Sequence, residues 1–293
     1  MKIGILGKSQ SYLPEAFAYK KYLEKFGHQT IITNNFNEVE NFDTIIMFMG
    51  FYPIKRNNNS KFIHEYNSLS LQPYAHFKNI LKNYLNFKPD KRIFLNNYVR
   101  FFFNFRDNIS YLNRDMGYDI SFKNCKKIKN KKIEFDLVYT GSFDNRKGLL
   151  KCIKYLSKFG FKIALIGNME DNLYNEFKKI DNLSLLGKLD LVEIIKIFNI
   201  TKCGLNYTPD IFPFNVQSST KTIEYSAAGL GVLSNRYIWV ESFEKSRSAN
   251  FLYLDQLINK DQIYNYNFKN ALVDDLIWEN ILKTNNFKEF IEN

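Results

Sequence analysis

The feature that most constrains the fold of this chain is a repeated alternation of short apolar runs with helical patterns. It begins with an apolar run at 2–7, a helical pattern from Pro14 to Phe26, and two further apolar runs at 28–33 and 43–49. Strands that alternate with helices at this spacing form βαβ units, whose parallel sheets are covered by helices on both faces. The amino-terminal part of the chain therefore predicts a doubly wound α/β domain.

The same alternation starts again at residue 135. The predicted strands lie at 135–140, 162–166, 183–186, 204–207 and 231–234, and the predicted helices at 149–159, 173–180, 191–198 and 221–228. Between the two arrays lies a basic, Asn-rich and aromatic stretch in which only one helix, 77–85, is predicted.

Two successive arrays of this kind predict two Rossmann-like domains, with a ligand cleft at the carboxyl ends of their strands. The expected divisions are an amino-terminal domain at 1–133, a carboxyl-terminal domain at 134–270 and a terminal helical segment at 271–293.

Positive charge is concentrated in the first of these domains. The chain has a net charge of +11, and residues 1–135 contain 22 Lys and Arg against 11 Asp and Glu, whereas the remainder contains 19 of each. Such a local excess indicates an acidic partner, which can be nucleic acid, an anionic membrane surface or a phosphorylated molecule. Basic residues alternate with Phe and Tyr between 77 and 105, so a nucleic-acid-binding protein stays open as an alternative.

Cysteine usage and apolar run lengths indicate the compartment. Cys125, Cys152 and Cys203 are an odd number with no CxxC pair, which favours neither a disulfide framework nor a zinc site. The first apolar run is too short for a signal peptide, and no run approaches the roughly 18 residues of a membrane span. We expect a cytoplasmic protein that is at most peripheral at the inner face of a membrane.

Four segments of the second half carry a family resemblance. They are Tyr139-Thr-Gly141 with Lys147-Gly148, then Ala164 to Asn168, Leu185 to Gly187, and Lys221-Thr-Ile-Glu-Tyr-Ser-Ala-Ala-Gly-Leu-Gly-Val-Leu-Ser234. In this order they resemble the nucleotide-binding domain of GT-B-type glycosyltransferases of the glycogen-synthase-like group, which builds bacterial surface polysaccharides such as lipopolysaccharide or capsule. The last segment is similar to the group's Lys-x-x-Glu-Tyr-x-Ala-x-Gly-x-Pro-Val signature. In the first half, Phe26-Gly27-His28 resembles the Gly-His turn that ends the group's first helix.

The resemblance implies a GT-B enzyme that transfers a sugar from a nucleotide diphosphate donor to a polysaccharide or lipid-linked oligosaccharide. It implies no metal and no cofactor besides the nucleotide-sugar substrate, and nucleic acid is not an expected partner. A nucleotide-sugar 2-epimerase shares the GT-B architecture and stays open as a second enzymatic interpretation.

The chemistry of the 220–224 segment agrees with this resemblance. Thr220 and Lys221 open a predicted helix, whose amino terminus and lysine ammonium group would attract a diphosphate. Glu224 lies one turn further on, where a carboxylate can accept hydrogen bonds from ribose hydroxyls. The resemblance adds further donor-binding residues near the start of the domain: Gly141, Ser142, Arg146 and Lys147.

Several positions depart from the pattern of the group, among them Gly231, which stands where the signature has proline. Val216 stands where retaining members usually carry a first glutamate, and Ser142 stands where an arginine often follows the glycine. Either Arg146 substitutes for that arginine or the diphosphate is held differently. If the enzyme inverts, its catalytic base should come from the first domain, and His64 and Glu65 are the candidates, with Asp115 as a further one.

Overall fold

The protein consists of two compact units, each built on one parallel sheet. A computed structural model describes residues 1–7, 13–50, 52, 56, 59–70, 74–125, 132–143 and 147–293. Unit 1 comprises residues 1–117 and 275–293, and unit 2 comprises residues 118–274. The structure thus divides the chain after 117 and after 274, whereas the sequence suggested divisions after 133 and after 270.

Unit 1 is a six-stranded parallel sheet in the order β2-β1-β3-β4-β5-β6. Its strands are β1 (Lys2–Leu6), β2 (Gln29–Thr33), β3 (Thr44–Phe48), β4 (Lys61–Tyr66), β5 (Lys91–Phe94) and β6 (Tyr111–Asn113). Its helices are α1 (Pro14–Glu24), α2 (Ala75–Leu85), α3 (Asn97–Phe103), α10 (Trp278–Thr284) and α11 (Phe287–Glu292).

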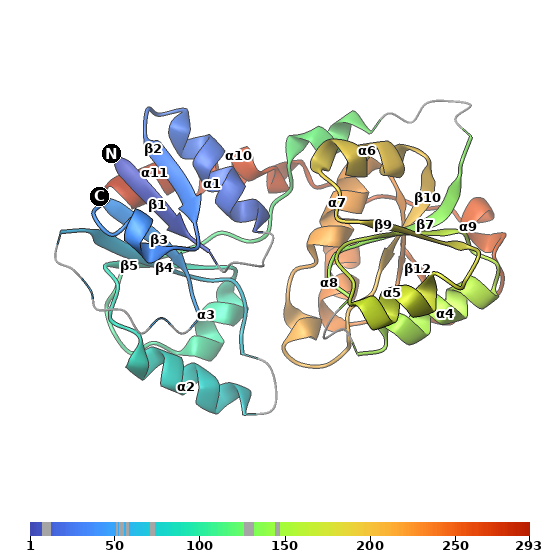
Figure 1. The fold of residues 1–293 in the computed structure, drawn as a ribbon, viewed down its shortest axis with the longest axis horizontal. Coiled ribbons are helices and arrows are strands. Elements are labelled where there is room, and N and C mark those ends of the chain that lie inside the picture. The colour runs from blue at the N-terminus through green and yellow to red at the C-terminus, as the bar shows by residue number, and fades with distance from the viewer. Residues whose placement is uncertain are drawn as a thin grey trace. The chain divides into compact units, whose positions relative to one another are not determined.

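Side chains of this sheet are buried on both faces, as parallel sheets require. In β3, Ile46 and Phe48 pack in one core and Ile45 and Met47 in another, because successive side chains of a strand point to opposite faces. Figure 1 shows α1, α10 and α11 on one side of the sheet and α2 and α3 on the other. The carboxyl-terminal segment therefore completes unit 1: the rings of Phe287 and Tyr19 lie 4.4 Å apart.

Unit 2 repeats this architecture with the strand order β12-β11-β10-β7-β8-β9. Its strands are β7 (Phe135–Thr140), β8 (Ile163–Ile166), β9 (Leu183–Gly187), β10 (Thr201–Asn206), β11 (Gly231–Ser234) and β12 (Leu252–Tyr253). Its helices are α4 (Leu149–Lys158), α5 (Asp171–Phe177), α6 (Leu191–Asn199), α7 (Thr220–Ala228), α8 (Ile238–Ser246) and α9 (Gln262–Asn265). Figure 1 shows α6 and α7 on one side of the sheet and α4 and α5 on the other.

Both sheets confirm the predicted fold class of two doubly wound α/β domains. The sequence pattern missed β4, β5, α3 and β6 in unit 1 and α8 and β12 in unit 2. Strand β6 has only three residues, which is too short to show a period. Strand β5 begins with Lys91 and Arg92, so it contains no apolar run from which a strand could be predicted. Among the described helices, none combines the length and the apolar character that a membrane-spanning segment requires.

Candidate functional site

Three glycine turns pack together at the carboxyl ends of β7, β8 and β9. Gly141, Gly167 and Gly187 all have positive φ angles. The Gly141 amide donates a hydrogen bond to the Ile166 carbonyl (2.9 Å), and the Gly167 amide donates to the Gly187 carbonyl (2.8 Å). A Cβ atom on Gly167 would overlap with the Gly141 carbonyl oxygen, so glycine is required there. Gly141, which was predicted to bind the donor, thus lies at the carboxyl-terminal edge of the sheet, where the backbone of neighbouring turns packs closely.

A buried polar network attaches the start of α7 to this edge of the sheet. Ser219 caps the helix by accepting a hydrogen bond from the Thr222 amide (3.4 Å), and its hydroxyl donates to Oδ1 of Asn206 (2.9 Å). The amide nitrogen of Asn206 in turn donates to Oγ of Ser234 (2.9 Å) and Oη of Tyr237 (3.0 Å). Because Asn206 and Ser234 are completely buried, the network holds the amino terminus of α7 at the ends of β10 and β11.

Lys221 lies beside the turn that follows β7. Its Nζ atom is 5.5 Å from the centroid of the Tyr139 ring, at the distance of a cation–π contact. The Tyr139 hydroxyl donates to the Ser142 carbonyl oxygen (2.8 Å), which orders the exposed Gly141–Ser142 turn. The structure therefore brings Gly141, Ser142, Thr220 and Lys221 to one end of the sheet.

Glu224 follows Lys221 by one helical turn and is half-buried. Its carboxylate accepts no hydrogen bond from any other residue in the described part of unit 2. Burial raises its pKa from the ordinary 4.5 to about 8, and the positive charge of Lys221 opposes this shift. A carboxyl group that is desolvated but lacks donors can bind a ligand that carries hydroxyl groups.

Lys147 is exposed and lies just before α4. The hydroxyl of Tyr207, which directly follows β10, donates a hydrogen bond to the Lys147 carbonyl oxygen (3.4 Å). This contact places the start of α4 at the same end of the sheet as α7. Arg146, the other basic residue predicted here, lies outside the described residues, and Val216 is half-buried in a short 3-10 turn, Phe214–Val216.

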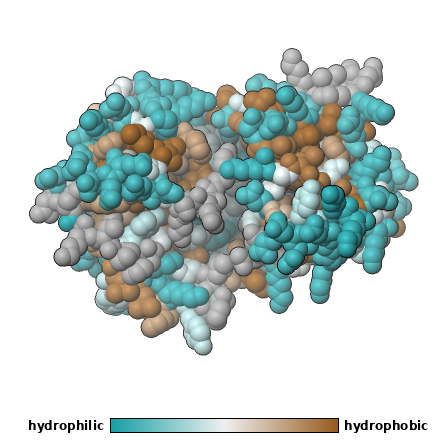
Figure 2. All heavy atoms as spheres, viewed as in Figure 1, coloured by the Kyte–Doolittle hydropathy of each residue, from teal (hydrophilic) through white to brown (hydrophobic). Residues whose placement is uncertain are grey.

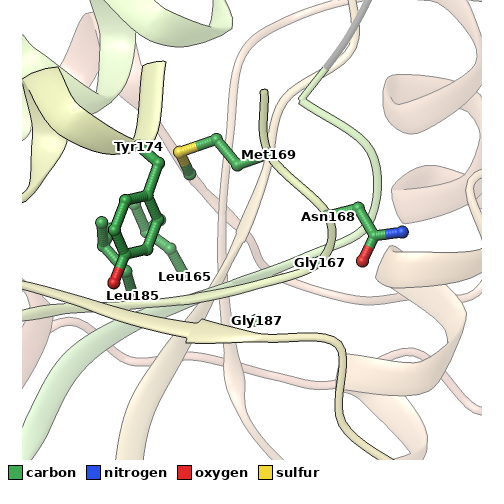
Figure 3. A pocket seen from close by; sticks show the side chains of 7 residues that line it. All are labelled: Leu165, Gly167, Asn168, Met169, Tyr174, Leu185 and Gly187. Atoms are coloured by element: carbon green, nitrogen blue, oxygen red, sulfur yellow. The ribbon is translucent and has the colours of Figure 1, made fainter. Parts of the chain in front are cut away.

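A cavity of about 220 Å³ opens at the ends of β8 and β9. In Figure 3, Leu165, Leu185, Met169 and Tyr174 gather on one side of it, and the side chain of Asn168 points away from them. Gly167 and Gly187 complete its lining. The cavity is therefore mostly apolar, and the predicted glycine turns form one of its walls.

The two candidate catalytic residues of unit 1 are both completely buried. They are neighbours on β4, so their side chains enter opposite faces of the sheet. The His64 ring packs against Phe87 at 4.9 Å between centroids, and burial lowers its pKa to about 3. Because neither side chain reaches the surface, this geometry does not support a direct catalytic role for His64 or Glu65.

Glu65 instead belongs to a buried ion-pair cluster centred on Arg114. Nε of Arg114 donates to Oε1 of Glu65 (2.7 Å), and Nη2 lies 3.4 Å from Oε1 of Glu15. Asn67 accepts a further hydrogen bond from Nη2 (2.7 Å), and the Tyr19 hydroxyl donates to Glu65 (3.0 Å). Burial nevertheless raises the pKa of Glu65 to about 7, with Arg114 opposing the shift.

This Arg114 cluster joins α1, β4 and the segment after β6, so its geometry indicates a structural role. Asp115, which directly follows Arg114, is exposed at a left-handed backbone position with a φ angle of 62°. Within the residues that the structure describes, no three His, Cys, Asp or Glu side chains are arranged to hold a metal ion.

The sequence did not predict the hydrogen-bond network of Asn206, the hydrogen bond from Tyr207 to Lys147 or the cavity. One local signal was present: Asn206 ends a predicted strand and Ser219 precedes a predicted helix, and both positions favour polar side chains. Their partners Ser234 and Tyr237 are far away in the sequence, so their identity depends on the tertiary structure.

Comparison with known proteins shows the fold of this chain. No protein-family model matches the sequence, and no curated protein matches it either. Among solved structures, AviGT4, a glycosyltransferase involved in avilamycin A biosynthesis, is similar over 100% of this chain and 97% of its own, with a TM-score of 0.65 and 11% identity. HepE from Anabaena, solved with UDP and glucose, is similar over 98% of this chain and 95% of its own, with a TM-score of 0.59 and 12% identity.

A putative UDP-N-acetylglucosamine 2-epimerase from Listeria monocytogenes is also similar. It matches 100% of this chain and 97% of its own, with a TM-score of 0.54 and 13% identity. At these identities the likeness concerns the fold, which is that of GT-B proteins with two Rossmann-like domains.

Proposed function

We propose that this protein is a glycosyltransferase whose unit 2 binds a nucleoside diphosphate sugar. The observation that carries the proposal is the pair Lys221 and Glu224, one turn apart at the capped start of α7, beside the Gly141–Ser142 turn. The GT-B fold supports it, because HepE, which shares this fold, was solved with UDP and glucose.

In this proposal the diphosphate binds at the amino terminus of α7. The diphosphate bridge carries about two negative charges, and the terminal N–H groups and positive dipole end of a helix favour such an anion. Lys221 supplies a cation next to the turn, and the exposed Lys147 supplies a second at the start of α4. We propose that these lysines, rather than a metal ion, neutralise the diphosphate, so chelation with EDTA should leave the transfer rate unchanged.

The nucleoside would bind between Glu224 and the cavity. Ribose hydroxyls can form hydrogen bonds with the Glu224 carboxyl group, whose carbonyl oxygen accepts even when the group is protonated and which lacks donors within the described part of unit 2. The apolar cavity lined by Leu165, Leu185 and Tyr174 lies on the same strand-end edge and can accept the flat surface of a base.

The reaction that we propose breaks the bond between the anomeric carbon of the sugar and the diphosphate oxygen. An acceptor hydroxyl forms the new bond to that carbon and loses its proton, and the nucleoside diphosphate leaves. The proposed acceptor is a polysaccharide or a lipid-linked oligosaccharide of a bacterial surface polysaccharide such as lipopolysaccharide or capsule, as the sequence resemblance implies. The basic unit 1 would then face this acceptor.

Nucleotide binding tests the donor site directly. Isothermal titration with nucleoside diphosphates should show that Glu224→Ala and Lys221→Ala each weaken binding of the preferred nucleotide at least about tenfold. Lys20→Ala and Glu24→Ala remove an exposed pair on α1 and serve as matched controls that should leave the affinity unchanged. Unchanged affinity in both Glu224→Ala and Lys221→Ala would contradict the assignment.

The likeness to the Listeria epimerase favours one alternative, a nucleotide-sugar 2-epimerase. The two reactions differ in their need for an acceptor. Incubation of the protein with a nucleotide sugar alone should leave the sugar configuration unchanged if the protein is a transferase. Formation of the 2-epimer without an acceptor would instead establish the epimerase.

A further inference from the structure

Helix α2 packs against unit 1 with its polar side. Oδ1 of the buried Asn79 accepts a hydrogen bond from the Ser70 amide (3.2 Å). The side-chain amide of Asn83 donates to the Phe103 carbonyl oxygen (3.0 Å), and that of Asn86, just after the helix, donates to the Gly50 carbonyl oxygen (3.0 Å). These asparagines recur every three or four residues, so they form one stripe along the inner side of the helix.

The outer side of α2 is apolar. Its exposed large hydrophobic side chains are Phe77, Ile80, Leu81, Tyr84 and Leu85. They follow the i, i+3, i+4, i+7, i+8 spacing that normally faces a protein core. Here Phe77 is 58% exposed and Tyr84 is 84% exposed, so the usual orientation of an amphipathic helix is reversed. Figure 2 shows hydrophobic residues at the surface over α2, at the lower left of the view.

Helix α3 contacts α2 and also exposes apolar side chains. Its side chains Tyr98, Phe101 and Phe102 are exposed, and the bond from Asn83 to Phe103 links the two helices. The α2–α3 patch therefore comprises eight residues, Phe77, Ile80, Leu81, Tyr84, Leu85, Tyr98, Phe101 and Phe102. Exposed apolar side chains gathered on neighbouring helices mark sites of interaction with other molecules or membranes.

Basic residues surround the patch in the sequence. Residues 77–107 contain seven Lys and Arg and two acidic residues, Asp90 and Asp107, and Asp107 pairs with the buried Arg92. The Asp90 carboxylate is already paired with Arg56 at 2.7 Å. Lys78, Lys88 and Arg106 are exposed. An apolar face bordered by cations is the composition that binds the interface of an anionic bilayer.

We propose that the α2–α3 patch docks unit 1 onto an anionic lipid membrane. Two features favour a membrane over other partners. Aliphatic side chains such as Ile80, Leu81 and Leu85 can enter the acyl region of a bilayer and the aromatic members can lie at its interface, whereas a nucleic acid could stack on the aromatic members alone. A symmetric contact between two copies would bring two basic surfaces together, which charge repulsion opposes. The inference concerns unit 1 and does not depend on the donor site of unit 2.

Flotation of the full chain with lipid vesicles tests this proposal. The protein should float with vesicles of phosphatidylcholine and phosphatidylglycerol, should bind vesicles of phosphatidylcholine alone more weakly, and should be released by high salt. The double variant Phe77→Ser with Leu81→Ser should lower the fraction bound to anionic vesicles at least about tenfold. The double variant Lys78→Glu with Lys88→Glu should lower binding to anionic vesicles alone.

The matched control replaces exposed apolar residues of unit 2. Ile258 and Leu272 are 79% and 76% exposed, so Ile258→Ser with Leu272→Ser removes similar apolar surface without touching the patch. Its vesicle binding should equal that of the wild type, and all variants should keep the wild-type melting temperature. Equal binding to both vesicle types, or equal loss in the patch and control variants, would overturn the proposal. So would a patch-dependent binding of single-stranded oligonucleotides or a patch-dependent dimer in the absence of vesicle binding.

Discussion

At the scale of single residues, Glu65 and Glu224 show how hydrogen-bond partners separate a structural carboxyl group from a candidate ligand-binding one. Burial raises the pKa of both groups, to about 7 for Glu65 and to about 8 for Glu224. Glu65 accepts hydrogen bonds from Arg114 and Tyr19 at Oε1, which anchors it within unit 1, whereas its buried Oε2 has no partner among the described residues. Within the described part of the chain no residue donates to Glu224, so solvent or a ligand can supply its hydrogen bonds.

The raised pKa of Glu224 predicts a pH-dependent stability. The folded protein holds this proton up to about pH 8, whereas the unfolded chain releases it near 4.5, so Glu224 destabilises the fold increasingly as the pH rises between these values. Glu224→Gln should therefore raise the urea midpoint at about pH 8.5 and leave it nearly unchanged at about pH 4.5. Glu24→Gln, at an exposed pair, is the control. An equal shift at both pH values would contradict the prediction.

We expect a large decrease in the free energy of unfolding when the charge of Arg114 is removed. Arg114→Met would leave the carboxyl groups of Glu15 and Glu65 buried without their cation, at a cost of about 3–5 kcal/mol in the free energy of unfolding. The loss should be smaller at about pH 5, because the pKa of Glu65 is raised to about 7 and this carboxyl group is then largely protonated. Arg236→Met removes an exposed arginine paired with Glu241 and Asp255 and should cost less than about 1 kcal/mol. Equal losses in urea denaturation would contradict this role.

At the scale of elements, the position of α7 depends on its close contact with β10. A Cβ atom on Gly204 in this strand would overlap with the ring of Tyr225, so only glycine lets the helix approach. The Tyr225 hydroxyl also accepts a hydrogen bond from the Thr140 amide at 3.1 Å, which links α7 to the end of β7. The contact thus positions the helix that carries Lys221 and Glu224.

Gly204→Ala should therefore destabilise unit 2 by about 2–3 kcal/mol and weaken nucleotide binding with it. Tyr225→Leu removes the ring with which the new Cβ atom would clash. The double variant should therefore lose less stability than the sum of the losses in the two single variants. A double-mutant cycle from urea denaturation measures this coupling. Additive losses of stability would show that the Tyr225 ring does not limit how closely α7 approaches β10.

At the scale of the whole molecule, the two ends of the chain meet in unit 1. Phe287 and Ile291 of α11 are completely buried against the core that includes Tyr19 and Leu23 of α1, and Trp278 of α10 lies over the Arg114 guanidinium at 5.3 Å. Unit 2 is formed by the continuous segment between them. The stability of unit 1 therefore depends on residues that follow unit 2 in the sequence.

A chain that ends at Asp274 should lose the fold of unit 1 and keep that of unit 2. Hydrogen exchange measured by mass spectrometry should show lost protection in β1, β3 and β4, whereas β7, β8 and β10 stay protected. The full chain at the same temperature is the reference. Full protection of β1 and β3 in the shortened chain would show that α10 and α11 contribute little to unit 1.

Local patterns in the sequence were sufficient to predict most of the fold and part of the candidate site. The apolar runs and their spacing located β1 to β3 and β7 to β11, because each strand and helix imposes its own period on neighbouring residues. The segment 220–224 could be placed at a helix start from its own residues, since caps and glycine turns have local signatures. Lys221 and Glu224 were therefore predicted, although their role as a donor site stays a prediction.

Only the tertiary structure decided which polar and apolar side chains are covered. His64 and Glu65 end an apolar run, yet both are completely buried because both faces of β4 are covered. Glu65 is in addition paired with Arg114, which is distant in the sequence. The apolar period of α2 likewise predicted a helix but not that its apolar side faces outward, because the orientation depends on the bonds of Asn79 and Asn83 to distant segments. Periodicity is a property of neighbouring residues, whereas burial depends on residues far apart in the sequence, and this is why the sequence determined the elements and the fold determined their exposed faces.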